Sequence, residues 1–149
     1  MITIRMLMKE NREKPAASVS HEASVFDALK LMAESNVGAL LVVNEVGQMV
    51  GIFSERDYAR KIIMLGKSSL NTPVQEIMSA HMVTIQPDQT LEEGLELMTQ
   101  HHIRHLPVME GGRLTGMVSM RDLVAALLHQ KDMLITRLEG YIQGNDYNR

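Results

Sequence analysis

The chain has 149 residues, 45% of them hydrophobic, which is enough to bury a core as one domain or two half-size subdomains. A net charge of -3 argues against a nucleic-acid binder, which needs a basic face. Cysteine is absent, so disulfides and thiolate sites are excluded, and we expect a cytoplasmic protein. The longest strongly apolar run, residues 39–43, is far shorter than a membrane span of about 20 residues, so no membrane partner is expected.

The chain contains two copies of one sequence pattern. Residues 18–57, the first repeat, align with residues 84–122, the second, at a shift of 66 residues that becomes 65 after the second copy loses one residue in a turn. The matched pairs include Leu29 with Leu95, Met32 with Met98, Gly51 with Gly116, Ser54 with Ser119 and Asp57 with Asp122. This regularity predicts a pseudo-symmetric pair of units.

Each repeat opens with a short extended segment, at residues 18–20 or 83–85, and continues with a helix. Apolar residues recur at the helical spacing i, i+3, i+4 and i+7 from Val25 and from Leu91. The helix starts carry the pattern of a capping box: Ser24 with Asp27, and Thr90 with Glu93.

Two strands and a second helix complete each repeat. We expect the strands at 39–43 and 49–53, and at 106–109 and 114–119. The second helix runs from near Asp57 to just before Gly66, and its counterpart from about Asp122 to His129. The order β-α-β-β-α predicts an α/β (α+β) fold. Its two repeats should pack sheet to sheet, because one repeat is too small to cover its own sheet.

The expected domain limits follow from this pattern. They are an N-terminal extension (1–14), repeat 1 (15–66), a linker with Pro73 (67–75), repeat 2 (76–130), and a C-terminal helix and tail (131–149). In the last segment Leu134, Leu138, Tyr141 and Ile142 share one helical face. That face either packs on the chain's own body or contacts a partner or a second copy.

Four stretches resemble the cystathionine-β-synthase (CBS) domain family: GIFSERD (51–57), its echo GMVSMRD (116–122), RHLPV (104–108) and VTIQPDQTL (83–91). The resemblance covers roughly residues 15–130 and implies a stand-alone pair of CBS repeats. Such pairs typically bind AMP, ADP or ATP, and some bind NAD(H) or S-adenosylmethionine, in clefts between the repeats.

The motif residues suit a nucleotide. Ser54 and Ser119 stand where a strand passes into a helix, whose first N–H groups can hold a phosphate. Arg56 and Arg121 offer guanidinium donors to phosphate, and Asp57 and Asp122 can accept both ribose hydroxyls. Gly51 and Gly116 would let a base approach the strand closely. The alternative is that Ser-x-x-Asp is a plain helix cap, and that Arg121 is a solvated helix residue.

The resemblance adds further contacts. It implies that backbone groups near Ala39 and His105 read the adenine edge. The remaining candidates are Pro107, Ser18 and Thr84.

The two rival functions are an enzyme and a ligand-free interaction module. An enzyme is disfavoured because the chain lacks nucleophile and phosphate-loop motifs, and His101, His102 and His105 lack metal-ligand spacing, so no metal is expected. A ligand-free interaction module remains the alternative. The favoured function is a non-catalytic energy or redox sensor that binds an adenine nucleotide, forms a homodimer through exposed helices, and signals to a separate effector protein.

Overall fold

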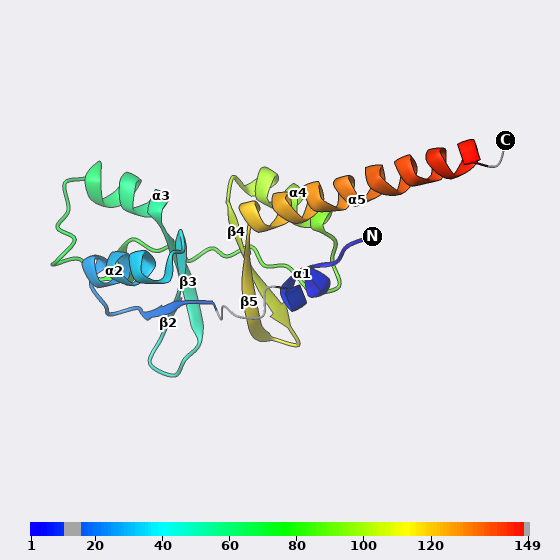
Figure 1. Ribbon diagram of the computed structural model, residues 1–149. Coiled ribbons are helices and arrows are strands. Elements are labelled where there is room, and N and C mark those ends of the chain that lie inside the picture. The colour runs from blue at the N-terminus through cyan, green and yellow to red at the C-terminus, as the bar shows by residue number, and fades with distance from the viewer. Residues whose placement is uncertain (11–15, 148–149) are drawn as a thin grey trace.

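The computed structural model describes residues 1–10 and 16–147 of the chain (Figure 1). The first repeat comprises β1 (Ser18–Ser20), α2 (Val25–Ser35), β2 (Ala39–Val43), β3 (Met49–Ser54) and α3 (Glu55–Asp57), which continues as a π-helical segment at Tyr58–Ile63. The second comprises α4 (Leu91–His101), β4 (His105–Glu110), β5 (Arg113–Ser119) and α5 (Met120–Tyr147). Helix α1 (Ile4–Glu10) precedes both repeats, and a 3-10 turn (Val74–Glu76) lies between them.

Each repeat contains a small sheet. In the first, β2 pairs in parallel with β1 and antiparallel with β3. In the second, β4 pairs antiparallel with β5, and the expected opening strand is reduced to a single parallel bridge between Ile85 and Val108. The strands of both repeats lie in the middle of the molecule and the helices lie to the outside (Figure 1). The predicted α/β fold of two repeats, each with a sheet and helices, is confirmed.

The first helices of the two repeats begin and end alike. The hydroxyls of Ser24 and Thr90 accept hydrogen bonds from the backbone N–H groups of Asp27 (3.1 Å) and Glu93 (3.2 Å), as the capping pattern predicts. Both helices end on a residue with positive φ: Asn36 at 53° and His102 at 54°.

Residues 3–8 and 73–78, here called the lead segments, occupy equivalent places on opposite repeats. Ile4 and Leu7 are buried in the core of the second repeat, whereas Val74 and Ile77 are buried in the core of the first. Each segment forms one backbone bridge to the start of a first helix: Thr3 with Thr90, and Pro73 with Ser24. Helix α1 accordingly lies beside β5 in Figure 1.

The packing of the lead segments does not follow the expected domain limits. Residues 1–10 of the expected extension contribute to the second core, and Ile77, expected in repeat 2, packs in the first. The expected linker is also fixed to the first repeat, since the carbonyls of Ser69 and Thr72 accept hydrogen bonds from Phe26 and Val25. The sequence comparison missed this because its alignment began at residue 18. Residues 11–15, which include the expected boundary at 14–15, lie outside the described residues.

The lead segments also explain the paired glycines. A Cβ on Gly51 would lie 2.6 Å from Sδ of Met78, and one on Gly116 would lie 2.5 Å from Cε of Met8. Methionine side chains thus fill the space that a side chain at either glycine would take, and the expected approach of a base to these positions stays a prediction. Flexible methionine suits this gap-filling role.

Helix α5 is one continuous helix from Met120 to Tyr147, so the expected break after His129 is absent. No proline or glycine lies between residues 121 and 139 to stop it. Its C-terminal half projects beyond the body (Figure 1), with Leu134, Leu138 and Ile142 exposed by 56%, 54% and 61%. These side chains are therefore not packed on the chain's own body. Among the described residues, no helix is long and apolar enough to cross a bilayer.

We predict that Gly51→Ala destabilises the protein by about 1–3 kcal/mol, the usual cost of overpacking. The added methyl meets Met78 and also the backbone oxygen of Ser79 at 3.0 Å, which cannot swing aside. Urea unfolding followed by circular dichroism measures the change. The control is Gly140→Ala, where no atom lies within 4 Å of the new Cβ and helix propensity should add up to about 1 kcal/mol. Equal stability of both variants would contradict the packing explanation.

Candidate functional site

Two clefts lie between the repeats, one for each Ser-x-Arg-Asp motif. The first cleft encloses about 830 Å³ and is lined by the motif of the first repeat together with residues 81–83 and 101–105 of the second. The second cleft encloses about 1100 Å³ and is lined by the motif of the second repeat together with residues 36–39 of the first. Each motif thus faces the other repeat, and both volumes are near the range of small-molecule sites.

The structure brings most of the expected site residues to the clefts. Ser54, Arg56, Asp57 and His105 line the first cleft; Ser119, Arg121, Asp122, Ala39 and His105 line the second. The other three expected residues line neither. Pro107 is buried within β4, paired with Met117, and Ser18 and Thr84 are exposed at the opening segments.

Both motifs form helix caps, as the structural alternative predicts. In the first, Oδ2 of Asp57 accepts from the backbone N–H of Ser54 (3.0 Å), and the Ser54 hydroxyl accepts from the N–H of Asp57 (3.2 Å). The second repeats this with Ser119 and Asp122 at 3.0 and 3.1 Å. The cap uses one carboxylate oxygen of each aspartate, and therefore holds the aspartate in place at the wall of its cleft.

The second carboxylate oxygens differ between the clefts. Oδ1 of Asp57 accepts a hydrogen bond from the Ser79 hydroxyl (3.2 Å) and lies 3.5 Å from Nζ of Lys61. For Oδ1 of Asp122, no donor is found among the residues that the structure describes. A ribose in the second cleft would thus meet a free acceptor, whereas one in the first would share it with Ser79 and Lys61.

One hydrogen bond crosses the first cleft. Nη1 of Arg56 donates to the carbonyl oxygen of His102 at 2.7 Å, joining the helix start of the first repeat to the end of α4. His102 has a positive φ, which turns its backbone toward this contact. A phosphate bound by Arg56 would compete for the same donor.

Several lining residues were missed by the sequence reasoning. They are Arg60, Lys61, Ser79, His81, His102 and Arg104 in the first cleft, and Glu10 in the second. Arg60 and Lys61 could have been found as the residues one turn after the motif. Ser79 and Glu10 follow the lead segments, and no local sequence pattern predicts where those segments pack.

His105 and Gly38 line both clefts and form the wall between them. A Cβ on Gly38 would lie 3.7 Å from the His105 ring. Burial lowers the pKa of His105, while the carboxylates of Asp122 and Glu55 oppose this shift and Arg104 adds to it. The neutral imidazole is therefore favoured in the folded chain.

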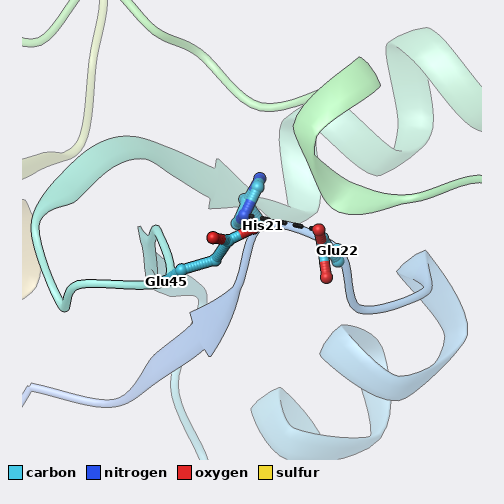
Figure 2. A group of neighbouring side chains, drawn as sticks. All are labelled: His21, Glu22 and Glu45. Carbon is cyan, nitrogen blue, oxygen red and sulfur yellow. Dashed lines mark ion pairs between the residues drawn. The ribbon is translucent and has the colours of Figure 1, made fainter.

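A separate group lies outside the clefts (Figure 2). His21, Glu22 and Glu45 place potential ligand atoms within 4.8 Å of one another. Nδ1 of His21 is already bonded to Gln75 at 2.7 Å, and the side chain of Glu22 is 65% exposed. Two exposed carboxylates and one histidine do not by themselves make a metal site, and we assign no ion to this group.

Comparison with known proteins shows similarity to one family. The model of the CBS domain matches residues 3–63 and 74–129. The mitochondrial CBS domain-containing protein CBSX3 of Arabidopsis thaliana is 43% identical over 125 residues, and the match covers 81% of this chain but only 61% of that protein.

Solved structures show the same similarity. A CBS-domain protein of Burkholderia ambifaria superposes with a TM-score of 0.79 at 42% identity, covering 85% of this chain and 94% of that one. The CBS domain protein PAE2072 of Pyrobaculum aerophilum, solved in complex with AMP, gives 0.72 at 25% identity, covering 81% and 89%.

We predict that His105 makes folding stability depend on pH. Because its folded pKa is lowered, its contribution is fully present above the ordinary value of 6.5 and is lost as the pH falls through the lowered folded pKa. His105→Gln cannot titrate, so its stability should fall less than that of the wild type between pH 7.5 and 5. Urea midpoints at several pH values measure this. His129→Gln, at an exposed position of α5, is the control; identical slopes for wild type and His105→Gln would refute the assignment.

Proposed function

We propose that this chain, which belongs to the CBS domain family, is a non-catalytic regulatory module that binds adenine nucleotides in its two clefts. The observation that carries the proposal is the pairing of each Ser-x-Arg-Asp motif with the opposite repeat. A ligand in either cleft would touch both repeats at once, which is what a sensor requires.

The chemistry of each motif fits a nucleotide. The carboxylates of Asp57 and Asp122 accept hydrogen bonds and suit the two ribose hydroxyls. Arg56 and Arg121 supply donors for phosphate. In the second cleft the long helix α5 adds the positive end of its dipole beside Ser119.

The opposite wall of each cleft suits the base. In the second cleft Val37, Gly38 and Ala39 offer small apolar side chains and backbone groups at the start of β2. In the first cleft Ile103 and His105 stand at the positions equivalent to Val37 and Ala39. The AMP complex of the Pyrobaculum relative supports adenine nucleotides as the ligand class.

Signalling would follow from the contacts that cross the clefts. The hydrogen bond from Arg56 to the His102 carbonyl joins the repeats in the first cleft. A phosphate that engages Arg56 would weaken this bond and favour a different arrangement of the repeats. A ligand with differential affinity for two arrangements shifts their populations, and a separate effector protein would read the result.

Homodimerisation through the helices is part of the proposal. Exposed apolar side chains lie after α3, at Ile63, Met64 and Leu65, and a second group lies along α5. Exposed clusters of this kind are typical of interfaces. A reducing compartment such as the cytoplasm accords with the absence of cysteine.

The first prediction concerns the ligand. Calorimetric titration of protein stripped of bound ligand should give micromolar affinity, about 8 kcal/mol, for at least one of AMP, ATP, NADH and S-adenosylmethionine. Silence with all four would favour an interaction module without ligand.

The second prediction concerns the ribose contacts. Asp57→Ala and Asp122→Ala should each weaken binding at the affected cleft by about ten- to a hundredfold, because a hydrogen bond to a charged group contributes about 1.5–3 kcal/mol. Both variants also lose a helix cap. The matched control is therefore Ser24→Ala, which removes the cap hydrogen bond of α2 and lines neither cleft. Unchanged affinity in both cleft variants would rule out the ribose contacts.

The third prediction concerns the dimer. Leu138→Lys should shift the protein toward monomer in light scattering coupled to size-exclusion chromatography, because burying a leucine contributes about 1.5–3 kcal/mol. Thr136→Lys adds the same charge at a polar position of α5 and should leave the dimer intact. A wild-type protein that stays monomeric would refute the interface.

A further inference from the structure

The two clefts differ sharply in charge. The first is lined by four basic side chains, Arg56, Arg60, Lys61 and Arg104, against two carboxylates, Glu55 and Asp57. The second is lined by one arginine, Arg121, against Glu10 and Asp122.

The difference in charge arises at matching positions of the two repeats. Under the shifts that align the repeats, Arg60 and Lys61 correspond to Ala125 and Ala126, and Arg104 corresponds to Gly38. His102 corresponds to Asn36, and both residues end a helix with nearly the same positive φ. The backbone is thus shared at the ends of the first helices, whereas Arg60 and Lys61 lie in a π-helical segment and Ala125 and Ala126 lie in α5.

Two of the four cations in the first cleft are already engaged. Lys61 pairs with Asp57 at 3.5 Å and donates to the Ile77 carbonyl at 3.0 Å, and Arg56 donates to His102. For Arg60 and Arg104, neither an ion pair nor a hydrogen bond is found within residues 1–10 and 16–147. Both side chains are exposed at the cleft, where guanidinium groups suit phosphate oxygens.

We infer that the first cleft selects nucleotides with two or three phosphates, and that the second cleft takes ligands with one phosphate or none. The inference rests on the proposed function and specifies the ligand class of each cleft. Arg60 and Arg104 are the specificity-determining residues, because they meet the phosphates beyond the one that Arg56 holds. The acidic balance of the second cleft opposes any added phosphate.

The test uses adenosine, AMP, ADP and ATP in calorimetric titrations of variants that keep one cleft each. Asp122→Ala retains the first cleft and Asp57→Ala the second, after circular dichroism has shown that both are folded. In Asp122→Ala, affinity should rise at least tenfold from AMP to ATP and fall as sodium chloride is added. In Asp57→Ala, affinity should stay level or decrease along the same series.

A second set of variants tests the named arginines in the otherwise unchanged chain. Replacing both Arg60 and Arg104 by alanine should reduce the affinity of the first cleft for ATP to that for AMP, with little change for AMP. The control is Arg113→Ala, an exposed arginine of β5 that lines neither cleft, and it should bind like the wild type.

The outcomes separate the two proposals. If AMP and ATP bind equally well in Asp122→Ala, or if the phosphate preference lies in Asp57→Ala, the charge inference is overturned while the nucleotide-binding function stands. If none of the four compounds binds the wild type, the proposed function fails, and the inference that rests on it fails as well.

Discussion

The structure depends on an exchange of segments between its two repeats. A sheet of two or three short strands with two helices is too small to close a core of its own. Each repeat is completed by a lead segment that fills it with three side chains: Ile4, Leu7 and Met8 on the second, and Val74, Ile77 and Met78 on the first. Residues 73–78 pack in the core of the first repeat, which they follow in the sequence. Residues 3–8, which precede the first repeat, pack in the core of the second. Each core therefore contains side chains from the segment that precedes the other repeat in the sequence.

The exchange also decides where the clefts lie. With the strands of both repeats in the middle of the molecule, the strand-to-helix junction of each repeat lines a cleft together with the start of the second strand in the other. The Ser-x-Arg-Asp motif sits at that junction. Its serine and aspartate cap the helix through one carboxylate oxygen, and the aspartate still lines the cleft. Helix cap and ligand contact are therefore compatible roles, since the cap fixes the carboxylate in the position that a ligand would need.

The repeats match in their cores and differ at their clefts. Met32 and Met98, or Leu40 and Leu106, are buried at corresponding positions. Arg104, by contrast, lines the first cleft with a basic side chain, and its counterpart Gly38 brings no side chain to either cleft. Packing constrains volume and shape at the buried positions, but the cleft positions are free to carry different charges. His105 and Gly38 belong to both clefts, so a ligand in one contacts the wall of the other.

The sequence by itself determined the elements of each repeat. Alternating apolar segments, the Ser24 and Thr90 caps and the glycine-containing turns are local signals, and the strands β2 to β5 and helices α2 and α4 lie within a residue or two of their expected positions. The two motifs could also be identified as a pair, because their repetition is visible along the chain. Six of the eleven expected site residues belong to these motifs and line a cleft; Ala39 and His105, which the resemblance implied, line a cleft as well.

Only the tertiary structure decided which repeat each lead segment completes. It also decided that Met8 and Met78 occupy the space beside Gly116 and Gly51, and that Arg60 and Arg104 line the same cleft. These are contacts between residues far apart in the chain, and no period of 2 or 3.6 residues carries them. The sequence likewise did not predict that α5 runs unbroken from Met120 to Tyr147. Its C-terminal half projects beyond the body, and no local sequence signal shows that a helix will do so.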